Sequence, residues 1–333
     1  VDLQFVDSLT GFMVSSRRNP DTSFVFKTTN GGDNWSTIQF VYYYLTSLYF
    51  VNKSIGYCVG DQNADYAVVL KTTDGGVNWF NTTYVSGFIY LNDVMFANKD
   101  TGWVTSNFVV GGGLWRTING GISWQQQLNE SVRPSKIFFV NNNTGWVIGN
   151  AGQNLYKTTN SGQNWFVQSS TSSENYSDVF FATQDTGWIV KNIGTGNKSL
   201  VRSTNGGNNW DSVNAPIIPT ESRLCFIGNR YGWAGSLFHK IYASKDGYNW
   251  GTQYSPSNRS DNISFSDTLH GWAAYTGLVH TIEGGGPIVS ENQTVTEVPK
   301  DFVLEQNYPN PFNSNTVIRY QVTGNRNVLI KVY

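Results

Sequence analysis

Several residue types are scarce in this 333-residue sequence, and each scarcity argues against a class of protein. Charged residues make up only 14% of the chain and the formal net charge is -1, so nothing draws the chain electrostatically to nucleic acid or anionic lipid. No apolar run approaches the ~20 residues of a spanning helix, so we expect no membrane insertion. The three histidines, His239, His270 and His280, lack the spacing of a metal centre, and neither a nucleophile elbow nor a phosphate loop occurs.

Cysteine is also rare, because Cys58 and Cys225 are the only two. Each lies in a segment that we expect to be a buried strand, and the two segments belong to repeats that are not neighbours. We therefore interpret both as small apolar side chains of the core rather than as a disulfide.

Aromatic residues and glycine are abundant, at 15% of the chain and 34 residues, and they are arranged in two repeated phrases. The first phrase is a phenylalanine, five residues, a glycine and an aromatic residue. It occurs seven times, 39 to 46 residues apart, and its copies end at Phe12, Tyr57, Trp103, Trp146, Trp188, Trp233 and Trp272. Repeats of ~40–45 residues with four short strands each are typical of propeller blades.

The second phrase follows each copy of the first. Its copies are TTNGGDNW (28–35), TTDGGVNW (72–79), TINGGISW (117–124), TTNSGQNW (158–165), STNGGNNW (203–210) and the shorter SKDGYNW (244–250). The seventh copy, TIEGGG (281–286), has Ile288 where the others have tryptophan.

Together the phrases predict an all-β fold, a seven-bladed β-propeller of four-stranded antiparallel blades over residues 1–293. In the fourth repeat we place the strands at 136–140, 146–148, 155–158 and 164–168, so that the last carries the second tryptophan. We expect the glycine before the first aromatic residue to supply a turn. The chain opens on an inner strand, so the outer strand of the last blade must come from 288–295 or from residues before Val1.

The second phrase resembles the Asp box, or BNR repeat. The resemblance implies that Asn30, Asp74, Asn119, Asn160 and Asn205 accept backbone N–H groups within a hairpin. The second glycine of each box is expected at positive φ. The tryptophans are expected to be buried between blades, namely Trp35, Trp79, Trp124, Trp165, Trp210 and Trp250. The paired phrases look most like propellers related to the photosystem II assembly factor, while sialidases, xyloglucanases and sortilin share the box with less of the surrounding pattern.

The tail differs in character, with a linker at 294–301 and a second segment at 302–333. That segment is similar to the C-terminal type A sorting domain of type IX secretion cargo, a small β-sandwich. The opening motif of that family matches Asn307, Tyr308, Pro309, Asn310, Pro311, Phe312 and Asn313. The family's domain is longer, so we expect a truncated copy here. The resemblance implies recognition by the type IX secretion machinery and a secreted or outer-membrane cell-surface location in a Gram-negative bacterium.

Propeller ligands usually bind over the channel mouth, on the loops at one end of the blades. The candidates on that face are Arg17, Arg18, Tyr42, Tyr44, Tyr66, Tyr90, Arg133, Arg223 and Arg259. The last three arginines each precede the first strand of a repeat, so they could converge on a carboxylate or remain scattered solvated charges. The tyrosines could form an exposed patch that stacks on a sugar or peptide, or pack between blades.

Asp61, Asn63 and Asp65 alternate as in the first half of a calcium loop, although Tyr66 stands where such a loop needs glycine. This segment is therefore either a structural calcium site or a plain polar loop, and we expect no other cofactor.

The sequence thus predicts a monomeric, secreted binding or adhesion module without catalysis, with a glycan or protein as ligand. One alternative is a sialidase- or xyloglucanase-like glycoside hydrolase, which needs two facing carboxylates. The acids available on that face are Asp21, Asp61, Asp65, Glu130, Glu174 and Glu221, and nothing in the sequence pairs them. A second alternative is a spacer with neither site.

Overall fold

The structure is a computed structural model, and it describes the chain as strands joined by tight turns. The described residues are 2–62, 66–85, 90–108, 111–149, 154–170, 176–192, 197–216, 218–219, 223–235, 240–254, 262–274, 278–285, 303–304 and 320–321. The chain divides into two compact units, Val1–Val289 and Ser290–Tyr333. Within the described ranges no helix is long and apolar enough to cross a membrane.

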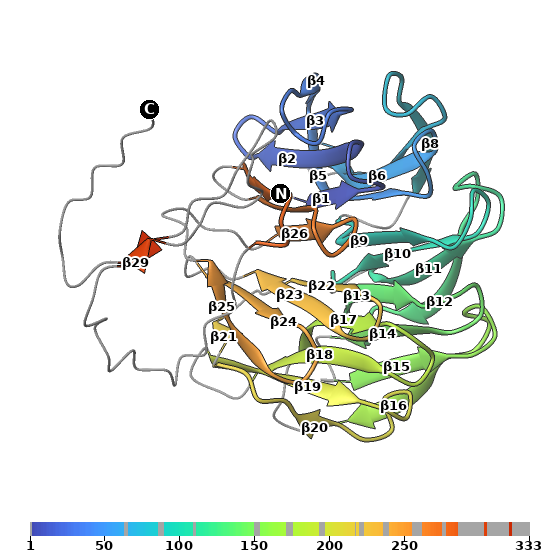
Figure 1. Ribbon diagram of the computed structural model, residues 1–333. Coiled ribbons are helices and arrows are strands. Elements are labelled where there is room, and N and C mark those ends of the chain that lie inside the picture. Colours follow the sequence, from blue (N-terminus) through green and yellow to red (C-terminus); the bar gives the residue numbers. More distant parts are fainter. Residues whose placement is uncertain are drawn as a thin grey trace, which may run out of the picture. The chain divides into compact units, whose positions relative to one another are not determined.

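The first unit contains seven antiparallel sheets that follow one another along the chain (Figure 1). Blade 1 has β1 (Asp2–Phe5), β2 (Gly11–Arg17), β3 (Thr22–Thr28) and β4 (Ser36–Val41). Blade 2 has β5 (Tyr43–Phe50), β6 (Gly56–Gln62), β7 (Tyr66–Thr72) and β8 (Phe80–Val85). Blade 3 has β9 (Asp93–Phe96), β10 (Gly102–Ser106), β11 (Gly113–Thr117) and β12 (Gln125–Asn129).

Blade 4 has β13 (Pro134–Phe139), β14 (Gly145–Gly149), β15 (Asn154–Thr158) and β16 (Phe166–Ser170). Blade 5 has β17 (Tyr176–Phe181), β18 (Gly187–Asn192), β19 (Asn197–Ser203) and β20 (Asp211–Ser212), and β21 (Ile218–Pro219) also pairs with β19. Blade 6 has β22 (Leu224–Ile227), β23 (Tyr231–Gly235), β24 (Ile241–Ser244) and β25 (Trp250–Tyr254). Blade 7 has β26 (Asn262–Phe265), β27 (Gly271–Ala274) and β28 (Leu278–Thr281).

The predicted seven-bladed propeller of four-stranded antiparallel blades is confirmed. Three strands of blade 7 lie among the described residues, and the residues expected to hold its outer strand, 288–295, lie outside them. In the second unit the described residues form only the short pair β29 (Val303–Leu304) and β30 (Tyr320–Gln321), and the sandwich expected there stays a prediction.

The first phrase of the repeat builds the seams between blades. Its terminal aromatic ring, on the second strand of one blade, stacks face to face on the phrase's phenylalanine in the next blade, with ring centroids 3.4 to 4.0 Å apart. The seven pairs are Phe12–Phe50, Tyr57–Phe96, Trp103–Phe139, Trp146–Phe181, Trp188–Phe226, Trp233–Phe265 and Trp272–Phe5. The last pair joins blade 7 to blade 1, so the described residues close the ring through their inner strands, and β1 and β26 lie side by side in Figure 1.

The glycine of the first phrase has a different role from the one we predicted. Gly11, Gly56 and their counterparts lie at the start of second strands, and they do not have positive φ. A Cβ on Gly11 would lie 2.4 Å from the ring of Phe5, and one on Gly56 would lie 2.4 Å from Phe50. The glycine is required because the phenylalanine ring of the neighbouring strand covers its Cα, not because the chain turns there.

The second phrase forms the hairpin at the other end of each blade. In blade 2 the Asp74 carboxylate accepts the backbone N–H groups of Val77 and Asn78, and Thr72 Oγ1 accepts that of Gly76. The second glycines of the first five boxes have φ between 77° and 99°, as predicted.

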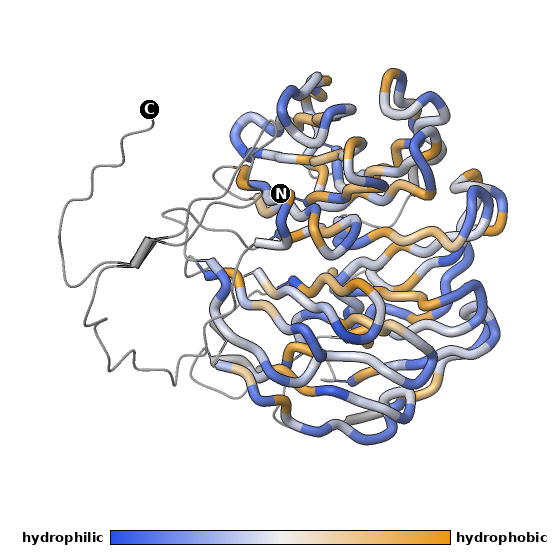
Figure 2. Tube along the Cα trace, viewed as in Figure 1, coloured by the Kyte–Doolittle hydropathy of each residue, from blue (hydrophilic) through white to orange (hydrophobic). Residues whose placement is uncertain are grey.

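Two strands of blade 4 begin two residues from the predicted positions, β13 at 134 rather than 136 and β16 at 166 rather than 164. In blade 4 the outer strand begins at Phe166, after Trp165, because the Asn164 N–H donates to Asn160 Oδ1 and cannot join the strand ladder. Hydrophobic residues follow the strands and hydrophilic ones the connecting hairpins (Figure 2).

Candidate ligand-binding face and central channel

The inner strands of the seven blades line a central channel of about 360 Å³. One position of each inner strand faces this channel, the residue three places before the phenylalanine of the first phrase. This residue is polar in every blade. These seven residues, the channel ring, are Asp2, Ser47, Asp93, Lys136, Asp178, Arg223 and Asn262.

The three aspartates of the channel ring tie blades 1, 3 and 5 to the blade that follows each of them. Asp2 accepts the backbone N–H of Leu48 at 3.0 Å, Asp93 that of Ile137 at 3.0 Å, and Asp178 that of Leu224 at 2.7 Å. The three carboxylates are thus held in place by main-chain donors.

Burial raises the pKa of Asp93 to about 7, even though the positive charge of Arg223 and the N–H of Ile137 oppose the shift. Lys136 Nζ also lies 3.0 Å from Asp93. Burial likewise raises the pKa of Asp178, to about 8, and the negative charge of Asp93 adds to that shift. Burial thus raises the pKa of two carboxyl groups of one channel.

A second cluster lies at the loop end of blades 1 to 3, around Arg18. Both guanidinium NH2 groups bind the buried carboxylate of Asp61, at 2.9 and 2.8 Å, and Nη1 also binds Asp21 at 2.7 Å. The guanidinium carbon lies 3.7 Å from the ring centroid of Tyr44 and 5.4 Å from that of Tyr90. Its bonds to Asp61 raise the pKa of Arg18, so its charge is permanent.

Two tyrosines beside this cluster are exposed to solvent, Tyr42 by 58% and Tyr66 by 54%. Tyr42 joins β4 to β5 with a φ of 70°, which is rare for an aromatic residue, and its N–H donates to the carbonyl of Asp21. Backbone held in this region often marks a functional position. By register Tyr66 pairs with Gln62, next to Asp61, at the same end of blade 2.

The tyrosine-rich segments divide between surface and core. Tyr43 packs against the core of blades 1 and 2 and contacts Phe40, and Tyr49 packs against that of blades 2 and 3. Tyr90 also contacts Phe108, with ring centroids 5.2 Å apart. Some of the predicted tyrosines are therefore exposed and others pack between blades, so both alternatives occur.

The structure does not bring the predicted arginines together. Arg223 lines the channel, whereas Arg133 has φ 45° in the turn before β13 and is not among the residues that line it. The register explains this, because Arg133 stands six residues before Phe139 but Arg223 only three before Phe226. Arg17 is exposed at the end of β2, and Arg259 lies outside the described residues.

Of the three predicted calcium ligands the structure describes only Asp61. Both carboxylate oxygens of Asp61 accept from Arg18, and Asn63 and Asp65 lie outside the described residues. Across the part of the chain that the structure describes, no three His, Cys, Asp or Glu side chains gather as a metal site requires. The sorting motif, 307–313, also lies outside the described residues.

The box residues lie at the opposite end of the blades, in hairpins that their side chains hold closed. Their tryptophans stand perpendicular to the phenylalanines of the same blades, at centroid distances of 5.6 to 6.2 Å. These residues build the fold and do not face the channel.

Sequence analysis missed six of the seven channel-ring residues, all except Arg223. The signal was present, because the position three before the repeated phenylalanine is polar in all seven repeats although it lies in an otherwise apolar strand. Aligning the repeats by register rather than by loop would have identified the ring.

The sheets, their stacked seams and the box hairpins define a seven-bladed Asp-box propeller. Residues 39–171, which include blades 2 to 4, match the family model described as Photosynthesis system II assembly factor YCF48. None of the curated proteins compared with the chain matches it.

Solved structures with the same fold include YCF48 bound to D1 peptide, with 17% identity, a TM-score of 0.64, and coverage of 85% of this chain and 92% of that one. YCF48 from Cyanidioschyzon merolae has 17% identity and a TM-score of 0.63, covering 84% and 94%. The GH74 xyloglucanase from Xanthomonas campestris has 10% identity and a TM-score of 0.57, covering 85% of this chain but 59% of that one. At these identities the likeness shows the fold alone.

Proposed function

We propose that this chain is a non-catalytic binding module that holds an extended peptide segment of a protein at the loop end of blades 1 to 3. The observation that carries the proposal is the Arg18 cluster. Arg18 is locked by Asp61 and Asp21 and stacked between Tyr44 and Tyr90, which leaves a fixed aromatic platform beside the exposed Tyr42 and Tyr66. Rigid tyrosines lose little conformational entropy on binding, and they are therefore favoured as anchors.

A peptide is favoured over a glycan because a propeller of this fold, YCF48, has a peptide as its ligand in one solved structure. A hydrolase is not favoured. Of the acids available to it, Asp21 and Asp61 do lie close together, since both bind Nη1 of Arg18, but Asp61 is fully buried with both oxygens engaged. A carboxylate held in this way has no free oxygen with which to attack or protonate a sugar.

The test is a peptide array and a glycan array probed with the full chain, followed by calorimetry on the best hit. We expect peptide hits, and we expect Tyr42→Ala with Tyr66→Ala to weaken them about tenfold or more. The matched control is Tyr248→Ala, an exposed tyrosine of the blade 6 box hairpin, which should change affinity less than about twofold. Hits on glycans alone, or released reducing sugar, would overturn the proposal.

We further propose that the chain is exported to the medium or the cell surface by type IX secretion, through residues 302–333. The support is the motif at 307–313. The test is immunodetection of the protein in the medium and on intact cells of the producing bacterium, with and without a working type IX translocon. We expect it outside the wild-type cells and retained in the translocon mutant. Equal export by both strains would contradict this.

A further inference from the structure

All five Asn–Gly and Asp–Gly pairs of the sequence occur at one place, the Asp box. Asn–Gly stands at 30–31, 119–120 and 205–206, and Asp–Gly stands at 74–75 and 246–247. Asparagine before glycine deamidates most readily, because glycine has no side chain to hinder the attack of its own amide nitrogen on the preceding residue. Boxes 1, 3 and 5 therefore combine a structural role with a chemically labile bond.

Deamidation requires two atoms of this pair to meet. The glycine nitrogen loses its proton and bonds to the side-chain carbonyl carbon of the asparagine. The bond from that carbon to the side-chain nitrogen breaks, ammonia leaves, and a five-membered succinimide remains. Water then opens one of the two carbonyls of the ring, which gives aspartate or isoaspartate.

In the closed hairpin of box 1 both reacting groups are bound to other partners. The Gly31 N–H donates to the carbonyl of Leu9, in the turn between β1 and β2, at 2.8 Å. The side-chain oxygen of Asn30 accepts the hydroxyl of Thr28 at 2.9 Å and the N–H of Asn34 at 3.0 Å. The nucleophile and the amide that it would attack are thus each held by a different part of the blade.

Boxes 3 and 5 hold their asparagines in the same way. Gly120 donates to the carbonyl of Asp100, and Gly206 donates to that of Asp185, each at 2.8 Å. The side-chain oxygens of the two asparagines again accept the box hydroxyl and the N–H four residues further on, at 2.9 to 3.0 Å. In all three boxes the reaction therefore requires the hairpin to open first.

The seams between blades fasten two of these hairpins from outside. The carbonyl of the box glycine accepts the indole N–H of a buried tryptophan of the neighbouring blade, Trp272 for Gly31 at 2.7 Å and Trp146 for Gly206 at 3.3 Å. Lys157 is a second donor to the Gly206 carbonyl, at 2.9 Å. Trp272 belongs to blade 7, so the hairpin of box 1 is fastened across the seam that closes the ring.

We propose that Asn30, Asn119 and Asn205 are latent modification sites, which stay intact while the hairpin and its seam are closed and deamidate when they open. Of the two products, aspartate is compatible with the hairpin, because Asp74 fills the same place in box 2 and accepts the N–H of Asn78 at 2.9 Å. In isoaspartate the main chain runs through the former side chain, which lengthens the backbone by one carbon and moves the acceptor away from the hairpin N–H groups. A box that carries isoaspartate cannot close, so the modification makes an opening permanent.

The test is peptide mapping by mass spectrometry after incubation of the full chain at mildly alkaline pH, once folded and once in denaturant. We expect the three asparagines to deamidate at least about tenfold more slowly in the folded chain, because local opening is rare in a packed structure. After refolding of the denatured sample, the folded fraction should retain aspartate at these sites and be depleted of isoaspartate. Equal rates in the two states, or isoaspartate retained in the folded fraction, would overturn the proposal.

Two seam variants serve as test and control for each other. Trp272→Phe keeps an aromatic ring at the seam but removes the indole donor, and it should raise the rate at Asn30 about fivefold, the effect of one lost hydrogen bond on local opening. Trp146→Phe should raise the rate at Asn205 by a smaller factor, because Lys157 still holds that box, and it should leave Asn30 unchanged. An equal rise at all three sites, or no rise in either variant, would mean that the seams do not protect these bonds.

Discussion

At the box end of the blades, six repeats carry the same kinds of side chain in nearly the same bonds, whereas at the channel the seven repeats carry five residue types at one position. The buried hydroxyl of each box, as in Thr28, Thr72 or Ser203, accepts the N–H of a positive-φ glycine. The channel ring, in contrast, mixes three aspartates with serine, lysine, arginine and asparagine. The box hydroxyl and the channel-ring residue both occur once in every repeat. The fold by itself therefore does not require different residue types at the channel position.

The difference separates residues that build a blade from residues that distinguish one blade from the next. Box carboxylates and amides accept exposed hairpin N–H groups, and such bonds lower the pKa of Asp74 to about 2. In the channel, by contrast, burial raises the pKa of Asp93 and of Asp178. The charged groups of the repeated hairpins are thus solvated. Those of the variable channel position are buried, where ionisation costs free energy.

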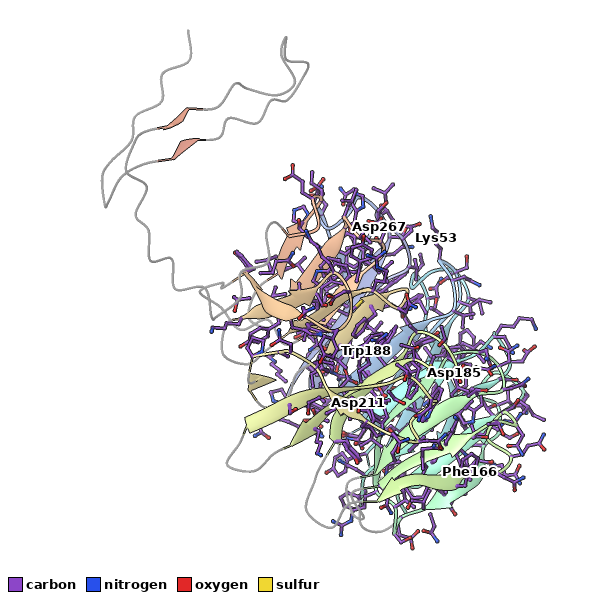
Figure 3. The ribbon with its side chains drawn as sticks, turned by 60° about the horizontal axis from the view of Figure 1, so that its bottom comes forward. Lys53, Phe166, Asp185, Trp188, Asp211 and Asp267 are labelled. Carbon is purple, nitrogen blue, oxygen red and sulfur yellow. The ribbon has the colours of Figure 1, made fainter. Side chains whose placement is uncertain are left out.

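The largest expected effect comes from the repeated part. Trp188, labelled in Figure 3, is fully buried. Its ring stacks on Phe226 at 4.0 Å and its N–H donates to the Gly247 carbonyl. Trp188→Ala should lower the free energy of unfolding by about 3–5 kcal/mol, because it removes the ring and leaves a cavity at the seam. Denaturant unfolding measures this loss.

The control for Trp188→Ala is Tyr248→Ala, which changes an exposed ring in the neighbouring box hairpin and should alter stability by less than about 0.5 kcal/mol. Similar losses for both variants would mean that the stacked seams are not what holds the ring together.

The repeated part is also the part that the sequence predicted well. Seven copies of Phe–x5–Gly–aromatic were enough to place the blades, because a pattern repeated at blade spacing reflects one local structure. The glycine was misread as a turn, since its role depends on a ring from the neighbouring strand that a single repeat does not reveal. The Arg18 cluster joins Arg18 and Asp21 of blade 1 to Asp61 of blade 2 and Tyr90 before blade 3, and no spacing within one repeat encodes such a contact.

The next effect concerns the channel and depends on pH. Asp178 is an acid whose folded pKa, about 8, lies above its unfolded value, so the folded state binds more protons than the unfolded state between about pH 4 and 8. Its contribution to stability is complete below pH 4 and is lost as the pH rises through 8. Unfolding followed from pH 5 to 8 should show the free energy of unfolding falling by at least about 1 kcal/mol, the value of one pKa unit.

Asp178→Asn should make this dependence shallower, because the amide oxygen can still accept the Leu224 N–H and no longer titrates, while Asp93 keeps its own contribution. Asp74→Asn is the matched control from the box end. The pKa of Asp74 is lowered, so its contribution is present above its unfolded pKa of about 4 and is lost only as the pH falls toward 2. The control should therefore leave the slope between pH 5 and 8 unchanged. A slope that is unchanged in Asp178→Asn would assign the titration to another group, with Asp93 as the first alternative.

The smallest expected effect is that of calcium on thermal stability. A calcium site at the loop end would need Asp61 as one of its ligands. Its buried carboxylate is already neutralised by Arg18, so a cation would have to displace a bidentate ion pair to reach it. The midpoint of thermal unfolding should therefore be the same in EDTA and in calcium chloride. A ligand present at one hundred times its Kd adds about 2.7 kcal/mol of stability, so an unchanged midpoint at about 5 mM calcium excludes a site tighter than about 50 μM. A rise of several degrees would mean that the 61–65 loop binds calcium despite Arg18, and the aromatic platform at blades 1 to 3 would then be organised by an ion rather than by a guanidinium.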